Sequence, residues 1–153
     1  MKKVIILNFV DSGLINVTTN TLDAPSAYKV YKFKREMNKR YKDINDERLS
    51  LISSVFGENY QNEITEFNRL LKIGDANFTE EESARFNDLK EKNIKSDKLI
   101  NEMVNDDVEL ENLQAIPYED WNALKKENEM KIPFAFEEAL ENILWLPLKE
   151  NDF

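Results

Sequence analysis

The feature that most constrains this chain is a seven-residue period of apolar side chains that begins near Ala27. One row of the period is Val30, Met37, Ile44 and Leu51, and the neighbouring row is Ala27, Lys34, Tyr41, Arg48 and Val55. Rows offset by three and four residues lie on one face of an α-helix. The period therefore predicts a helix over residues 25–56, which is about 45 Å long at about 1.5 Å per residue.

Local signals define both ends of this helix. Asp23 is a suitable N-cap residue, and Pro25 suits a first helical turn, where its missing N–H has no helical partner. Gly57 is a natural stop, because glycine readily adopts the backbone conformation that ends helices.

A second long helix is predicted over residues 80–105. Thr79 and Glu82 have the spacing of a capping box, and two heptad rows follow, made of Phe86, Asn93 and Ile100 and of Leu89, Ser96 and Met103. A helix of about thirty residues needs a partner in a chain this small. We therefore expect an antiparallel hairpin of residues 25–56 with 80–105, linked by a shorter helix at Asn62–Leu71 that ends near Gly74.

The rest of the chain predicts short elements. At the N-terminal side these are a strand at Lys3–Leu7 and a short helix within Asp11–Leu22. Beyond the hairpin we expect a strand or extended segment at Val108–Leu113, a helix at Tyr118–Leu124 with Trp121 inward, a charged loop at 125–131, a last helix at Phe134–Trp145 and a loose tail.

The predicted fold class is therefore mainly α, with a short N-terminal strand or helix and a small C-terminal α/extended subdomain. We expect one domain over 1–153, as suits a chain of 153 residues. Its parts are the helical hairpin 23–106, a packing segment 107–147 and the tail 148–153.

Composition argues against catalysis. The chain has no cysteine and no histidine, so it lacks thiol nucleophiles, the most frequent general base and the most frequent transition-metal ligand. Ser26 and Lys29 have the Ser-x-x-Lys spacing of some acyl-enzyme hydrolases, but the companion motifs are missing, and we interpret the pair as a helix start. We predict a protein that is not an enzyme and that uses no cofactor.

Charge is distributed unevenly along the chain. Residues 1–42 carry 9 basic and 3 acidic groups, and residues 43–153 carry 12 and 27, which gives a net charge of −9. The basic run 29–42 is interleaved with Tyr28, Tyr31, Phe33 and Tyr41, a pattern found in nucleic-acid binding. The acidic remainder favours a solvated or acid-paired helix face instead, because binding to phosphates needs a positive surface. The asymmetry predicts head-to-tail contacts, within the fold or between subunits.

The acidic cluster of Asp106, Asp107, Glu109 and Glu111 has two interpretations. Alternation places Glu109 and Glu111 on one face, where carboxylates can bind a divalent cation. Acidic residues are also common at strand edges, where they prevent aggregation. The second interpretation is favoured, and we predict no metal ligands, although cation binding by this cluster remains an alternative.

The chain is expected to act in the cytoplasm. The apolar stretch after Lys2 and Lys3 stops at Asn8, without the features of a signal peptide, and no segment approaches the length of a bilayer span.

The order of these features resembles a group of small helical proteins encoded by tailed bacteriophages and prophages. The resemblance covers residues 15–145. It rests on five segments in order: the capped start Leu22–Val30, the charged helix with Asp46-Glu47-Arg48-Leu49, the segment Glu63–Leu71, the acidic alternation Asp107–Leu110, and Ile116-Pro117 before a short C-terminal helix. It implies a phage origin and an assembly, accessory or host-interaction role, in the host cytoplasm or in the virion, and it supplies no active-site residues.

Three functions follow as hypotheses. The first is a non-catalytic phage-type interaction protein, an assembly factor or minor virion component, that binds itself or a phage or host protein through the hairpin. The second is an acidic inhibitor of a host nucleic-acid-binding or defence protein. The third is a carboxylate-based metal enzyme. The residues expected at an interaction surface are Lys32, Arg35, Lys39, Arg40, Lys42, Asp107, Glu109 and Glu111.

Overall fold

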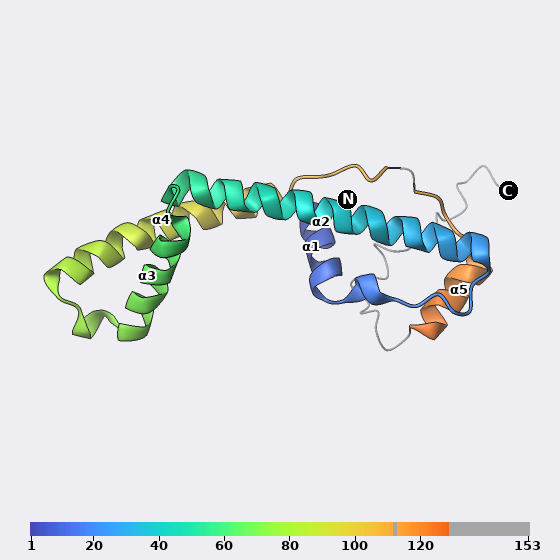
Figure 1. The fold of residues 1–153 in the computed structure, drawn as a ribbon, viewed down its shortest axis with the longest axis horizontal. Coiled ribbons are helices and arrows are strands. Elements are labelled where there is room, and N and C mark those ends of the chain that lie inside the picture. Colours follow the sequence, from blue (N-terminus) through green and yellow to red (C-terminus); the bar gives the residue numbers. More distant parts are fainter. Residues whose placement is uncertain (112, 129–153) are drawn as a thin grey trace. The chain divides into compact units, whose positions relative to one another are not determined.

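The computed structural model describes residues 1–111 and 113–128, and this part of the chain is mainly helical (Figure 1). It contains no strand within those ranges. The elements in chain order are α1 (Lys3–Asp11), η1 (Leu14–Asn16), α2 (Ala24–Phe56), α3 (Tyr60–Ile73), η2 (Asp75–Asn77), α4 (Glu80–Val104) and α5 (Tyr118–Glu127).

The chain divides into two compact units. Unit 1 consists of Met1–Ile44 together with the chain from Asp107 on, and unit 2 is the continuous segment Asn45–Asp106. Helix α2 contributes residues to both, since it is a single helix of 33 residues (Figure 1).

The predicted start, end and buried face of α2 are confirmed. The Asp23 carboxylate accepts a hydrogen bond of 2.8 Å from the Ser26 backbone N–H, as a capping residue does. The helix ends at Phe56, and Gly57 follows with a φ of +90°, a conformation that glycine adopts without steric cost. Three residues of the first heptad row are buried, namely Val30, Met37 and Ile44.

The prediction of a strand at Lys3–Leu7 is wrong, because this segment is the first part of helix α1. Its β-branched residues favour strands, but Ile6 and Phe9, three residues apart, are both buried on one helical face. The Phe9 ring packs edge-on against Phe33 of α2, with ring centroids 5.4 Å apart. Tertiary packing therefore overrides the local preference at this position.

The segment between α1 and α2 is fastened to the end of α5. The predicted helix within Asp11–Leu22 is limited to η1, and the chain then runs without regular structure to α2. The buried Asn128 side chain accepts a hydrogen bond of 2.9 Å from the Thr18 N–H and donates to the carbonyls of Thr18 and Leu124, each at 2.9 Å. The two bonds with Thr18 therefore satisfy the backbone N–H and C=O of a residue that lies outside any helix.

Glu127 completes this attachment. Its carboxylate accepts hydrogen bonds from the backbone N–H groups of Asn20, at 2.9 Å, and Thr21, at 3.4 Å, and from the Thr21 hydroxyl, at 3.1 Å. Desolvation acts to raise the pKa of Glu127, but these donors outweigh it and hold the pKa below its usual value.

Glu127 should therefore contribute to acid sensitivity. A carboxyl whose pKa is lower in the folded than in the unfolded chain stabilises the fold above the unfolded pKa of about 4.3, and this stabilisation is lost as the pH falls through the folded pKa. We expect Glu127→Gln to unfold more readily than the wild type at neutral pH and to lose less stability on acidification. Urea unfolding at a series of pH values measures both. Parallel pH curves for the two proteins would contradict this role.

Residues 107–111 and 113–117 contain no helix. Asp107 forms an isolated antiparallel bridge with Lys2, and of the expected strand or extended segment at Val108–Leu113 the described part, 108–111 and 113, forms no strand and no helix. Helix α5 starts after Pro117 as predicted, and Trp121 is fully buried. The helix runs to Glu127, into the segment expected to be a charged loop. The predicted helix Phe134–Trp145 and the tail 148–153 lie outside the described residues.

Unit 2 is built around α3, α4 and the last turns of α2. Phe56, Leu70 and Leu89, one from each helix, form a buried cluster. The Phe67 ring stacks on Phe86 with centroids 5.6 Å apart, and α3 contacts α4. Both predicted helices are confirmed, since α3 covers the expected segment Asn62–Leu71 and α4 covers nearly all of 80–105.

The predicted capping box at the start of α4 is confirmed. The Thr79 hydroxyl accepts a hydrogen bond of 3.1 Å from the Glu82 N–H, and the Glu82 carboxylate accepts one of 3.3 Å from the Thr79 N–H. Within the ranges 1–111 and 113–128, no helix is long and apolar enough to cross a membrane.

Candidate functional site

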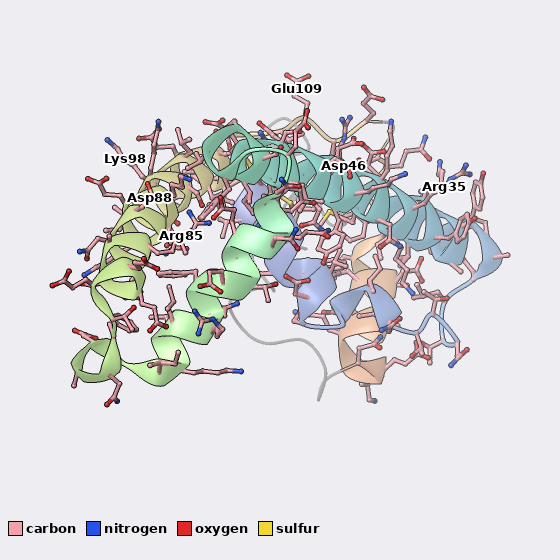
Figure 2. All side chains as sticks on the ribbon, turned by 60° about the vertical axis from the view of Figure 1, so that its left-hand side comes forward. Arg35, Asp46, Arg85, Asp88, Lys98 and Glu109 are labelled. Carbon is pink, nitrogen blue, oxygen red and sulfur yellow. The ribbon has the colours of Figure 1, made fainter. Side chains whose placement is uncertain are left out.

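The basic run predicted from the sequence forms one outward surface of α2, which we call the basic face. Its positions repeat at three and four residues on the side of the helix away from the buried row, and Arg35 projects from α2 into solvent (Figure 2). The basic face consists of Tyr28, Tyr31, Lys32, Arg35, Lys39 and Lys42.

The N-terminal end of the basic face is aromatic. The rings of Tyr28 and Tyr31 stack with centroids 6.2 Å apart, and these residues are 60% and 55% exposed. The Lys32 ammonium lies 5.1 Å from the centroid of the Tyr28 ring, a cation–π distance, and 3.5 Å from the Gln114 side-chain oxygen. Large exposed aromatic side chains beside cations are typical of protein-interaction surfaces.

Tyr31 and Arg35 form a ridge between two shallow concavities of unit 1. The first, of about 490 Å³, is lined by both ridge residues and by Tyr28, Lys32, Glu36, Lys39 and Glu111. The second, of about 400 Å³, is lined by the same ridge and by Ile15, Asn16, Lys34 and Asn38. A partner that covers the ridge has a hollow on each side to fill.

Lys34 belongs to the basic run of α2 but has a contact within the fold. Its ammonium donates to the backbone carbonyl of Val17, and burial lowers the pKa of Lys34. Lys34 falls in the same heptad row as Ala27 and Tyr41, and this position indicates that its side chain lies beside the buried face of the helix. Lys34 therefore anchors the segment before α2 and is not a member of the basic face.

Two predicted interaction residues, Arg40 and Glu111, are paired within the fold. The Arg40 guanidinium lies 2.8 Å from the Glu36 carboxylate and 3.5 Å from Glu111, and the hydrogen bond to Glu36 raises the pKa of Arg40. The Glu36 carboxylate also accepts a bond of 3.4 Å from the Glu111 N–H. Arg40 therefore attaches the segment after Asp107 to α2.

The other cations of the basic face are available to a partner. Arg35, Lys39 and Lys42 are exposed, and none forms an ion pair or hydrogen bond within residues 1–111 and 113–128. The structure thus separates the five predicted cations into three that are unpaired, one in contact with Tyr28 and one in an internal network.

The acidic cluster is not assembled into a metal site. Asp107 is in the bridge with Lys2, Glu111 faces Arg40, and Glu109 is exposed and points outward (Figure 2). Across the described ranges, no group of three or more carboxylates is arranged to hold a metal ion. The hypothesis of a carboxylate-based metal enzyme gains no support from this arrangement.

The Ser-x-x-Lys pair has structural contacts. Ser26 is 2% exposed, and its hydroxyl donates to the Asp120 carboxylate of α5. The Lys29 ammonium donates to the Ala115 carbonyl at 3.2 Å. Both residues join the first turns of α2 to the segment around α5, in agreement with the interpretation of the motif as a helix start.

Comparison of this chain with family models, curated proteins and solved structures gave no match. The arguments for function therefore rest on the geometry of the basic face.

Proposed function

We propose that this chain is a non-catalytic, phage-type interaction protein, an assembly factor or minor virion component, that binds an acidic protein surface through the basic face of α2. The carrying observation is the set of three unpaired cations, Arg35, Lys39 and Lys42, beside the exposed Tyr28–Tyr31 pair. The proposal places the protein in the cytoplasm of the host cell or in the virion. It also includes the finer fold prediction, an antiparallel hairpin of residues 25–56 with 80–105.

A protein partner suits this face better than a nucleic acid does. The chain carries a net charge of −9, so a long polyanion is repelled by most of the molecule. The Tyr28 ring is already in contact with Tyr31 and Lys32, so a nucleotide base would have to displace one of them. A short acidic surface reaches the cations without disturbing either contact.

The alternative, an acidic inhibitor of a host nucleic-acid-binding or defence protein, has less support. Mimicry of a phosphate backbone needs rows of unpaired carboxylates. Several carboxylates of unit 2 are paired with cations of the same unit: Glu66 and Glu82 with Arg69, and Glu63 and Asp88 with Arg85 and Lys92.

The proposal predicts a specific loss of partner binding. We expect the tagged wild type, pulled down from infected or lysogenic cells, to bring capsid, portal or tail proteins with it. The triple variant Arg35→Ala, Lys39→Ala, Lys42→Ala should lose them, because an exposed cation contributes to a partner contact and little to stability.

The matched control removes three other exposed cations, Lys72, Lys90 and Lys126. This control has the same net charge as the triple variant and should keep the partner. Equal retention by both variants would contradict the role of the basic face. Recovery of a host nuclease, polymerase or defence protein that both variants retain would favour the inhibitor.

A further inference from the structure

The outer surface of α4 carries an acidic stripe whose spacing matches the basic face. Glu81, Ala84, Asp88 and Glu91 are all exposed and lie three, four and three residues apart. Lys32, Arg35, Lys39 and Lys42 follow the same spacing on α2. At about 1.5 Å per residue, both rows are about 15 Å long.

The acidic stripe is only partly paired within its own chain. Asp88 lies 3.5 Å from Arg85 and 3.3 Å from Lys92, and Figure 2 shows Arg85 and Asp88 together on α4. Glu81 and Glu91 form no ion pair within the described residues. These contacts of Asp88 are exposed, so a partner's cation can replace them at little cost.

We propose that the acidic partner of the basic face is a second copy of this chain, whose α4 packs against α2 in the antiparallel direction. This inference rests on the proposed function and names its partner. In this direction Lys32, Arg35 and Lys42 lie opposite Glu91, Asp88 and Glu81 of the other copy, and the small Ala84 lies opposite Lys39. Opposite charges at helical spacing are a common basis for pairing between helices.

The exposed apolar residues select this direction. Continuing the antiparallel register places Tyr28 opposite Lys95 and brings Tyr31 beside Ile94, which is 59% exposed. In the parallel direction Tyr28 would lie beyond the start of α4, opposite Asn77, and Tyr31 would lie opposite Glu80, far from Ile94. The antiparallel register therefore places opposite charges face to face and brings the exposed side chains of Tyr31 and Ile94 together.

Self-association should depend strongly on salt. The test is light scattering coupled to gel filtration, with the chain at about 1 to 100 µM. At about 50 mM salt we expect a species heavier than one chain. At about 500 mM salt we expect a return towards the monomer, because charges are then screened beyond a few ångströms. The proposal is overturned if the wild type stays monomeric at low salt over this whole range of protein concentration.

Two charge reversals test the surfaces. Arg35→Glu with Lys39→Glu and Lys42→Glu reverses α2, and Glu81→Lys with Asp88→Lys and Glu91→Lys reverses α4. Each variant alone should be monomeric, with the association constant lowered at least about tenfold, and an equimolar mixture should associate again. Circular dichroism verifies that each variant is folded.

The control variant Lys72→Glu with Lys90→Glu and Lys126→Glu carries the same net charge as the reversed α2 variant. It should associate like the wild type, and if it does not, general repulsion explains the losses and the proposal falls. Failure of the mixture to associate also overturns it.

Binding of a labelled single-stranded oligonucleotide that the α2 reversal abolishes would assign the basic face to nucleic acid. A monomeric wild type whose pull-down partner still depends on Arg35, Lys39 and Lys42 would refute the second copy and leave the proposed function intact.

Discussion

Replacing Trp121 with alanine is expected to destabilise the protein by about 3–5 kcal/mol, the usual cost of removing a buried aromatic side chain. Trp121 is fully buried in α5, where Leu124 is also buried. The change should accelerate amide hydrogen exchange in α1, α5 and the first half of α2, because these segments belong to unit 1. Urea unfolding measures the total loss, and hydrogen exchange locates it.

Two further variants make this prediction specific. Lys126→Ala changes an exposed residue of the same helix, and its stability should stay within about 0.5 kcal/mol of the wild type. Trp121→Phe should cost less than Trp121→Ala, because the indole N–H has no hydrogen-bond acceptor in the described part of the chain, so only volume is lost. A Trp121→Ala protein as stable as Lys126→Ala would mean that α5 is not part of the core.

Replacing Leu89 with alanine should destabilise unit 2 by about 2–5 kcal/mol. Leu89 is fully buried against Phe56 and Leu70, so its removal leaves a cavity between side chains of three helices. We expect faster hydrogen exchange in α3 and α4. Because each unit has its own core, Leu89→Ala and Trp121→Ala should accelerate exchange in different segments of the chain.

Ile94→Ala is the matched control for Leu89→Ala. Ile94 lies on the same helix and has a side chain of the same size, but it is 59% exposed. At about 500 mM salt, where the chain is expected to be a monomer, its replacement should change stability by no more than about 0.5 kcal/mol. Similar losses for Ile94→Ala and Leu89→Ala would show that α4 is buried on a different face.

The long helices could be predicted because local and long-range signals agree. In α2 the capping residue Asp23, the terminal Gly57 and the heptad rows indicate the same boundaries, and in α4 the capping box agrees with the heptad rows. The buried row Leu89, Ser96 and Met103 was also readable, even with a serine at its centre. The pairing of the two helices stays a prediction, since a heptad pattern specifies a buried face but not its partner.

Helix α1 shows where local signals fail. Its apolar residues are mostly β-branched, and no side chain caps its start, so the sequence favours a strand. Phe33 shows a different kind of error, because its place in the basic run groups it with Tyr28 and Tyr31, which are exposed, whereas Phe33 is buried. Its position three residues after Val30 and four before Met37 places it in the buried face, where it contacts Phe9.

The basic face was predictable only in part. Composition and helical spacing identified the cations of residues 29–42 but could not show which of them are paired. Arg40 is bound by Glu36, a neighbour one turn away, and also by Glu111, far along the chain. A contact of that sequence separation has no local signature. The unpaired character of Arg35, Lys39 and Lys42 therefore needs the folded structure.

Unit 1 is assembled from two distant stretches of the chain, and this order affects its synthesis on the ribosome. Phe9 and Phe33 belong to the first stretch, while Trp121 and Leu124 belong to the second. At about 5–20 residues per second, Asn128 at the end of α5 is added roughly 4–17 s after Ile44. Unit 2 is continuous, and all of its core residues are synthesised before the second stretch of unit 1 begins at Asp107. The nascent protein therefore holds one finished unit while the apolar side of the other is still open to chaperones.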